Sequence, residues 1–332
     1  MAKWCRGGGI HSNDFCDVIS VDNLFFSWKT FRKGKRSKAD VAEFELNLED
    51  NIFRLHDSLT SGKWKPDPYT AFYVQDPKLR RIHKASVRDR VLYQAIYQKL
   101  YPLFDKTFIH DSYSSRNRKG THRGVKRFEE FARKATRNYS KNAFTLKCDI
   151  RKFFDSIDHQ VLLNLIKRKC TDQYLLELIS KIIFSFETSH GKGLPLGNVT
   201  SQIFANIYMN ELDQFAKHVL KAKYYIRYCD DFVIVNTSKD ELISYISQLS
   251  NFLKDRLSLE LHPKKISIRK ISQGIDFLGY VSLPHYRVLR TRTKRRILKK
   301  VSKDNITSYL GMLIHCKGLK IKNTILSKIM LL

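Results

Sequence analysis

Apolar positions in the first part of the chain recur mainly at the spacing of an amphipathic helix. This periodicity predicts helices at residues 23–34, 39–59 and 87–96, and a basic helix at 122–137. The aromatic and β-branched segment 69–75 predicts a strand, and a second strand near 79–84 would complete a basic hairpin. Residues 1–20 contain three consecutive glycines and no clear period, so we expect a leader without regular structure.

From residue 143 the pattern changes to short strands separated by helices. The predicted strands are 143–150, 224–229, 232–236, 265–270 and 275–282. The predicted helices are 157–170, 172–186, 199–220 and 239–257, followed by a basic helical tail from residue 291. This order predicts an α+β fold in which helices cover one face of an antiparallel sheet. The other face would be free to hold a ligand.

Charge narrows the class of partner. The 332 residues include 61 Lys and Arg against 32 Asp and Glu, which gives a net charge of +29. Such an excess favours a polyanionic partner, and nucleic acid is the first candidate because phosphate neutralisation releases counterions. The alternative is a basic protein of the membrane surface. That class needs an amphipathic helix with a clean apolar face, and none dominates this chain.

The six cysteines indicate neither a zinc site nor a disulfide framework, because none forms a Cys-x-x-Cys pair. Cys5, His11 and Cys16 would lack a fourth metal ligand at suitable spacing. Free thiols suit a reducing compartment. No apolar run approaches the ~18 residues of a membrane span. We therefore expect a cytoplasmic protein without a membrane partner.

Three aspartates form the candidate site of chemistry. Asp230 and Asp231, in the sequence Tyr-Cys-Asp-Asp, lie at the tip of a predicted hairpin, where the alternation of strand side chains breaks. Asp149 ends the predicted strand 143–150. Such a cluster suits two divalent ions about 4 Å apart, as in phosphoryl transfer. The alternative is an ordinary Asp-rich turn. Asp155 is expected to cap the following helix, and neither it nor Asp158 is placed in the site.

Five segments, in order, resemble the motifs of reverse transcriptases. They are Arg-Arg-Ile-His-Lys-Ala-Ser-Val-Arg-Asp-Arg at 80–90, a first palm motif at 146–159, Gly-Leu-Pro-Leu-Gly-Asn-Val-Thr-Ser-Gln at 193–202 with the helix after it, Tyr-Cys-Asp-Asp at 228–231 and Phe-Leu-Gly-Tyr at 277–280. The resemblance implies an RNA-directed DNA polymerase, a nucleotidyltransferase with a right-hand fold. It also implies a division into a leader at 1–20, fingers at 21–142 and partly near 160–190, a palm at 143–285 and a short helical thumb at 286–332.

The resemblance also assigns roles. Asp149, Asp230 and Asp231 would hold two Mg²⁺ ions, with Mn²⁺ as a possible substitute, helped by the backbone carbonyl of Ile150. Lys265 would protonate pyrophosphate. The nucleotide-binding residues would be Arg80, Phe154, Leu196, Gly197 and Gln202. Phe154 would exclude a ribose 2′-hydroxyl, unless it is a core residue. The primer grip would consist of Phe277, Leu278, Gly279 and Tyr280.

Basic residues follow the primer grip. Arg290, Arg292, Lys294, Arg295 and Arg296 are too many to find acidic partners within one helix. We expect them to track the phosphates of an RNA/DNA hybrid. The alternative is a solvated basic face.

One departure from the common motif narrows the resemblance. Leu196 stands where most reverse transcriptases have Gln, and Ser201-Gln202 stands where Ser-Pro is usual. This form resembles the enzymes of diversity-generating retroelements, which copy a template RNA with errors at adenines for mutagenic retrohoming. It implies template RNA, dNTPs and a small basic accessory protein as partners. Two alternatives stay open: an antiphage-defence or stand-alone group II intron-like reverse transcriptase, and a non-catalytic RNA-binding or splicing helper on a polymerase fold.

Overall fold

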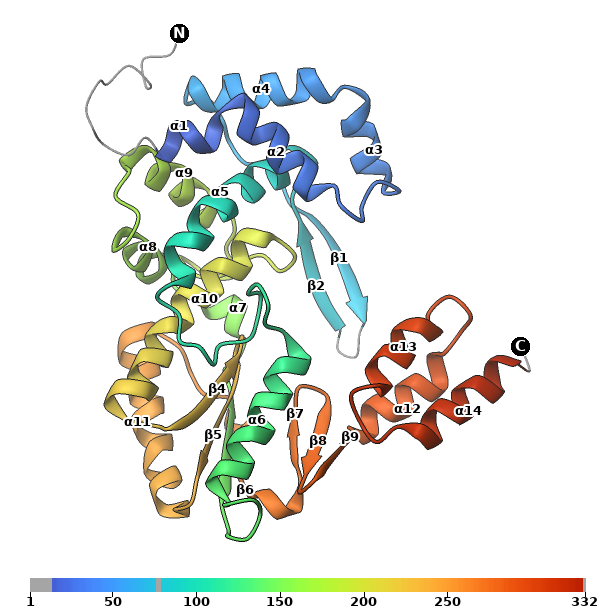
Figure 1. Cartoon of the computed structure of the whole chain (residues 1–332). Helices are drawn as coiled ribbons and strands as arrows, with labels where there is room; N and C mark the ends of the chain where they lie inside the picture. Colours follow the sequence, from blue (N-terminus) through green and yellow to red (C-terminus); the bar gives the residue numbers. More distant parts are fainter. Residues whose placement is uncertain (1–13, 76–78, 331–332) are drawn as a thin grey trace. The chain divides into compact units, whose positions relative to one another are not determined.

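The computed structural model describes residues 14–75 and 79–330, except the side chain of Met330 (Figure 1). The chain forms two compact units. Unit 1 contains the described part of Met1–Phe108, with Lys152–Glu211 and Asp255–Leu259. Unit 2 contains Ile109–Arg151, Leu212–Lys254 and the described part of Glu260–Leu332. Each unit therefore assembles from separate stretches of chain. The boundaries expected for fingers, palm and thumb stay predictions.

Unit 1 is mainly helical. Its N-terminal stretch supplies α1 (Asp14–Ile19), α2 (Val21–Phe31), α3 (Ala39–Leu46), α4 (Leu48–Thr60) and α5 (Val87–Asp105). Its second stretch supplies α7 (Phe153–Ser156), α8 (His159–Lys167), α9 (Gln173–Ile183) and most of α10 (Val199–Gln214). α1 buries Phe15, Val18 and Ile19, which explains why residues 14–19 are helical where an irregular leader was predicted. The other leader residues before 14 lie outside the described part.

Short polar side chains begin several of these helices, because a side-chain oxygen can accept an otherwise unpaired backbone N–H. Ser86 Oγ accepts from Asp89 N at 3.2 Å at the start of α5. At α8 the cap is Asp158, whose Oδ1 accepts from Val161 N at 3.0 Å, so the expectation that Asp155 would cap this helix is wrong. The single helix predicted at 39–59 is divided between α3 and α4 at Asn47, which has non-helical dihedrals.

The predicted hairpin of unit 1 is present. β1 (Thr70–Gln75) and β2 (Leu79–Lys84) pair antiparallel, from Thr70 opposite Lys84 to Gln75 opposite Leu79. Every residue of β1 is exposed. The base of β2 is attached to the loop before α10, because His83 N donates to Leu196 O at 2.9 Å.

Unit 2 is built around a four-stranded antiparallel sheet with the strand order β4-β5-β3-β6 (Figure 1). The strands are β3 (Phe144–Asp149), β4 (Tyr224–Tyr228), β5 (Asp231–Asn236) and β6 (Ser267–Lys270). α6 (Thr121–Ala135) packs on β4 and β5. Phe128, Phe131 and Ala132 of this helix join Ile226 and Val233 of the sheet in one buried cluster. α11 (Lys239–Leu257) begins in unit 2, and the π-helical turn Phe215–Val219 follows α10.

A second sheet of unit 2 has the order β7-β8-β9. The strand predicted at 275–282 is divided into β7 (Ile275–Phe277) and β8 (Tyr280–Leu283), because Leu278 and Gly279 take positive φ values of 50° and 90° and turn the chain. β9 (Tyr286–Leu289) has no counterpart in the prediction. Lys265 lies in a 3₁₀ turn, Pro263–Lys265, and not in the strand predicted at 265–270.

The tail forms three helices, α12 (Thr291–Lys300), α13 (Ile306–Leu313) and α14 (Leu319–Met330). Ile297, Leu313 and Ile325 pack with Val125 of α6 and Tyr280 of β8 in a shared core. The helical tail and the α+β class are thus as predicted. In the described part of the chain, no helix combines the length and apolarity needed to cross a membrane.

Phe128 tests this packing. Its side chain is 1% exposed, and its ring centroid lies 5.8 Å from that of Phe277. Phe128→Ala should lower the free energy of unfolding by about 3–5 kcal/mol, because the cavity cannot close fully. Phe26→Ala, on the exposed side of α2, is the matched control and should change it by less than about 0.5 kcal/mol. Urea unfolding measures both, and equal effects would contradict the assignment of this core.

Candidate active site

The three predicted aspartates lie together at one end of the sheet of unit 2. β3 ends at Asp149, β5 begins at Asp231, and the register places these two residues directly opposite each other. Asp230 precedes Asp231 in the tight turn between β4 and β5. Cys229 in this turn takes a φ of 57°, which a non-glycine residue rarely adopts. Strand pairing therefore brings Asp149 next to the turn that carries Asp230, 81 residues later in the sequence.

Two lysines neutralise part of this charge. Lys265 Nζ lies 2.5 Å from Asp149 Oδ1, and the segment before it is fixed to β3 because His262 N donates to Asp149 O at 2.8 Å. Lys147 Nζ lies 3.3 Å from Asp231 Oδ2. Lys265 was predicted in the site and Lys147 was not. The sequence could have indicated Lys147, because it lies two residues before Asp149, and side chains two residues apart in a strand point to the same face.

Burial disfavours the charged forms of the Asp230 and Asp231 carboxylates. It raises the pKa of Asp231 to about 6, a rise that Lys147 opposes and that Asp149 and Asp230 reinforce. Burial also raises the pKa of Asp230, and the charge of Asp149 raises it further. The site therefore concentrates more negative charge than its own lysines balance.

A divalent cation fits this donor set. Asp231 Oδ1 is buried and has no hydrogen-bond partner, and hard cations prefer carboxylate oxygens. Among residues 14–75 and 79–330, however, no three His, Cys, Asp or Glu side chains are already gathered as a metal-binding group. Lys265 and Lys147 instead bind Asp149 and Asp231. Both lysines would thus compete with a metal ion for these two carboxylates. Ile150 is buried, and its backbone bridges to Leu261.

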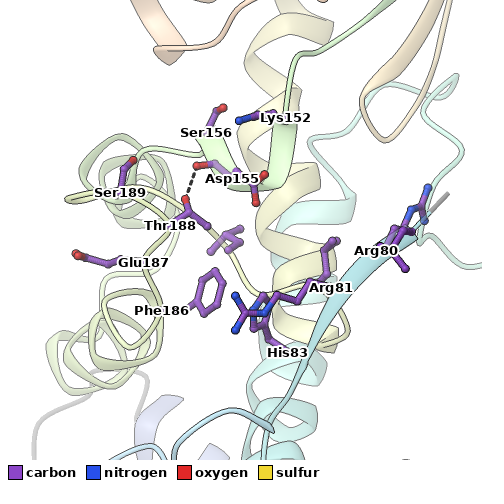
Figure 2. Close-up of a pocket in the computed structure, with 13 residues that line it drawn as sticks. Arg80, Arg81, His83, Lys152, Asp155, Ser156, Phe186, Glu187, Thr188 and Ser189 are labelled. Carbon is purple, nitrogen blue, oxygen red and sulfur yellow. Dashed lines mark hydrogen bonds between the residues drawn. The ribbon is translucent and has the colours of Figure 1, made fainter. Parts of the chain in front are cut away.

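Unit 1 contains a cavity of about 920 Å³ (Figure 2). β2 contributes Arg80, Arg81 and His83, and Leu196 belongs to the wall as well. The other lining residues are Leu79, Lys152, Asp155, Ser156, Phe186, Glu187, Thr188, Ser189 and Leu194. The cavity thus combines the cationic side chains of Arg80, Arg81 and Lys152 with apolar and aromatic surface. This composition suits a ligand that carries phosphates and a ring.

The walls of this cavity are fixed by short contacts. Thr188 Oγ1 donates to Asp155 O at 2.7 Å, the dashed line in Figure 2. The His83 and Phe186 ring centroids are 4.5 Å apart. Gly197 has a φ of +115°, and a Cβ there would lie 2.8 Å from a methyl group of Ile82, so a larger residue would separate β2 from the loop. Phe186 carried no signal in the sequence, since it lies outside every motif.

Gly197 and the two other predicted nucleotide-binding residues, Phe154 and Gln202, are not among the residues that line the cavity. Phe154 is half-buried, with its carbonyl accepting from Leu194 N at 2.8 Å and its ring centroid 5.3 Å from that of Phe153. Gln202 is exposed on α10. The structure thus brings Arg80 and Leu196 to one cavity and leaves Phe154 and Gln202 outside its lining.

The predicted primer grip is largely a core element of unit 2. Phe277 is fully buried, and Tyr280 is buried with its hydroxyl donating to Met312 O at 3.0 Å. Leu278 and Gly279 form the turn between them.

The basic residues after the primer grip differ in exposure. On α12, Arg292, Lys294 and Arg295 are exposed and Arg296 is partly exposed. Arg290, just before the helix, is bound to Asp276. The side chains of Arg292, Lys294 and Arg295 are therefore accessible to solvent.

Comparison with known proteins identifies the family. Residues 66–282 match the model of the family "Reverse transcriptase (RNA-dependent DNA polymerase)", and this range covers more than half of the chain. The chain belongs to the reverse transcriptase family. This membership confirms the predicted enzyme class, an RNA-directed DNA polymerase.

Two curated relatives support a group II intron-like lineage. Protein YkfC of Escherichia coli is 24% identical over 79% of this chain and 77% of YkfC. The group II intron-encoded protein LtrA of Lactococcus lactis is 25% identical over 84% of this chain and 56% of LtrA. The chain thus spans little more than half the length of LtrA.

Solved structures support the predicted right-hand fold. Telomerase from Candida albicans superposes with a TM-score of 0.52 at 12% identity, over 71% of this chain and 50% of the telomerase. Telomerase from Candida tropicalis gives a TM-score of 0.50 at 15% identity, over 67% of this chain and 55% of the telomerase. At such identity the likeness shows the fold alone, and it confirms the predicted fold class.

The cysteines require one correction. Cys148, Cys170, Cys229 and Cys316 are free, as expected. Cys16 is disulfide-bonded, so the expectation of free thiols is wrong there. Cys5 and His11, the other ligands considered for a metal, lie outside the described residues.

The raised pKa of Asp231 predicts a pH-dependent stability. Between pH 3.8 and about 6 the folded protein retains a proton that the unfolded chain has lost, so stability falls as pH rises through this window. Asp231→Asn removes this fall. In metal-free buffer its stability relative to the parent should therefore increase by up to about 3 kcal/mol between pH 4 and pH 7.

Urea unfolding at several pH values measures this difference. Asp240→Asn, which replaces an exposed aspartate at the start of α11, is the matched control for the substitution itself. A constant offset for Asp231→Asn would show that Asp231 is not perturbed.

Proposed function

We propose that this reverse transcriptase copies an RNA template into cDNA at the site formed by Asp149, Asp230 and Asp231. The observation that carries the proposal is the strand register, which sets Asp149 opposite Asp231 beside a buried carboxylate oxygen without a partner. Two divalent cations, Mg²⁺ or its substitute Mn²⁺, would when bound activate the primer hydroxyl and stabilise the leaving oxygen of pyrophosphate. The three carboxylates, helped by the carbonyl of Ile150, would hold them.

The chain's own cations have separate roles in this proposal. Lys265, already held by Asp149, would donate a proton to the departing pyrophosphate. Arg80 would bind the triphosphate of a dNTP in the cavity of unit 1, because a guanidinium can pair with two phosphate oxygens. Gly197 keeps the wall of that cavity close to β2. In this proposal Phe154 would exclude a ribose 2′-hydroxyl, and Gln202 would contact the nucleotide.

Nucleic acid would be held by charge and by the turn of the primer grip. The exposed Arg292, Lys294 and Arg295 suit the phosphates of an RNA/DNA hybrid, and their contribution should weaken with salt. With Phe277 and Tyr280 buried, the Leu278–Gly279 turn would meet the primer end.

The aspartate cluster is tested by Asp230→Asn. This variant should abolish dNTP incorporation on an RNA template, because loss of one carboxylate disturbs cation binding at the whole cluster. RNA affinity should stay nearly unchanged, since it depends on cations elsewhere. Single-nucleotide incorporation and filter binding measure the two properties, with Asp240→Asn as the matched control. Near-normal incorporation by Asp230→Asn would refute the site, whereas a parent protein that incorporates no dNTP would favour the non-catalytic RNA-binding helper.

We further propose that the enzyme belongs to a diversity-generating retroelement and copies adenines with errors. The support is the motif, in which Leu196 replaces Gln and Ser201-Gln202 replaces Ser-Pro. Leu196 lines the cavity proposed for the nucleotide. An amide at this position can hydrogen-bond, whereas leucine offers only shape, and apolar contacts discriminate weakly between similar ligands. A small basic accessory protein would be a partner. The adenine preference itself rests on the family resemblance.

Leu196→Gln tests this explanation. The variant should lower misincorporation, most strongly opposite template adenines, by about tenfold for each 1.4 kcal/mol of restored discrimination. Leu79→Gln is the matched control, because it makes the same change at an exposed position of the same cavity and should leave the error pattern unchanged. Sequencing of cDNA from the purified enzymes measures both.

A low, base-independent error rate in the parent enzyme with its accessory protein would remove the retroelement proposal. The remaining alternative would then be an antiphage-defence or stand-alone group II intron-like reverse transcriptase, which the similarity to LtrA also suits. The flanking DNA separates these cases, because a template repeat and an adenine-mutated variable repeat belong only to the retroelement.

A further inference from the structure

A fully buried ion pair lies beneath the turn that carries Asp230. Arg227 of β4 and Asp213 at the end of α10 both have side chains with 0% exposure. Arg227 Nε and Nη2 each donate to a different oxygen of Asp213 at 2.7 Å, a two-pronged contact. Tyr225 Oη donates to Asp213 Oδ1, also at 2.7 Å. Removing two charges from water is costly, and apolar residues of similar volume often serve stability as well or better. A contribution to folding stability alone is therefore a weak explanation for the presence of this buried ion pair.

The third nitrogen of the guanidinium reaches the turn itself. Arg227 Nη1 donates to the carbonyl oxygen of Cys229 at 2.9 Å. Cys229 is the residue with a φ of 57°, and its carbonyl belongs to the peptide bond that leads into Asp230. Arg227 therefore holds the peptide group immediately before one proposed metal ligand and two residues before the next.

The guanidinium is held in place from several sides. Asp213 fixes its plane, and Nη2 also donates to Ser112 Oγ at 3.1 Å. The backbone of Arg227 pairs with a neighbouring segment, since its N–H donates to Asp111 O and its carbonyl accepts from Tyr113 N. A planar group with fixed donors can hold a carbonyl in one position, whereas an ammonium on a flexible stem cannot.

We propose that Arg227, oriented by Asp213, is a positioning residue that holds the Cys229–Asp230 turn in the conformation required for the carboxylates of Asp230 and Asp231 to share cations. Arg227 does not touch substrate in this role. The inference depends on the proposed function of the aspartate cluster. The inference predicts that loss of the Arg227 guanidinium impairs cation binding and turnover. This effect is expected even in a folded variant in which Arg227 and Asp213 are replaced together by apolar residues.

The decisive variant is the double replacement Arg227→Met with Asp213→Leu. It removes both charges together and leaves neither one buried without a partner, so the protein should remain folded, with a Tm close to that of the parent. The Cys229 carbonyl nevertheless loses its donor. We expect kcat for dTTP incorporation on an oligo(dT)-primed poly(rA) template to fall at least about tenfold, since small misplacements in a reacting site can cost ~100-fold. KM for dTTP should change less than about twofold.

A second readout does not depend on catalysis. Binding of Mn²⁺ to the protein alone, followed by electron paramagnetic resonance of the free ion, should weaken in the double variant to a similar degree as in Asp230→Asn. Template–primer affinity should be unchanged. A folded double variant with parental kcat and Mn²⁺ affinity would overturn the proposal and leave the ion pair a purely structural role.

Two single variants keep the test decisive if the double variant does not fold. Arg227→Lys retains a charge beside Asp213 but cannot reach Asp213 and the Cys229 carbonyl together, so kcat and Mn²⁺ affinity should still fall. Tyr225→Phe is the matched control, because it removes a hydrogen bond to Asp213 and leaves the contact of Arg227 with Cys229 in place. Equal losses in the two variants would overturn the proposal by showing a general weakening of the cluster.

Asp230→Asn separates failure of this inference from failure of the proposed function. If Asp230→Asn retains incorporation, the aspartate cluster is not the active site. If Asp230→Asn is inactive while the folded double variant is fully active, only the role of Arg227 is refuted.

Discussion

Mutual repulsion of three carboxylates at the end of one sheet is the constraint on which the rest of unit 2 depends. The register that places Asp149 opposite Asp231 brings like charges together in a partly buried position, and burial raises the pKa of Asp230 and of Asp231. Such an arrangement costs stability unless cations oppose it. Lys147 and Lys265 supply part of that opposition from β3 and from the 3₁₀ turn. In the proposed function, a divalent cation would supply the remainder and would compete with these lysines for the carboxylates.

The sheet tolerates this charge because its other positions are firmly packed. Phe232, Val233, Ile234 and Val235 of β5 are all buried, so the strand that begins with Asp231 cannot slip without exposing its core. A shift of one residue would move every side chain to the opposite face. The same packing therefore fixes both the core and the position of the proposed metal ligand. The buried Arg227–Asp213 pair adds a directional contact at the turn, where strand pairing ends.

The sequence was sufficient for features that follow from local pattern. Apolar periodicity predicted most helices and strands, and the five motifs placed Asp149, Asp230 and Asp231 in one site. It was insufficient where long-range contacts decide. Residues 14–19 are helical because Phe15, Val18 and Ile19 find a buried surface, which no local period reveals. Phe186 lines the cavity from a loop that contains none of the five motifs. Asp213 could not be distinguished from other helix residues in the sequence, because only the fold brings it into contact with Arg227.

In the cavity of unit 1, the loop that contains residue 196 is held by contacts that do not depend on the residue type at that position. The loop is attached to β2 through backbone atoms, since His83 N donates to Leu196 O, and through Gly197, whose missing Cβ allows Ile82 to approach. Neither contact uses the side chain of residue 196. An exchange between Gln and Leu at this position therefore changes the chemistry of the cavity wall without removing the contacts that hold the wall in place. Backbone attachment thus separates the geometry of the cavity from the chemistry of its wall, and in the proposed function a single substitution at position 196 would change nucleotide selectivity at little structural cost.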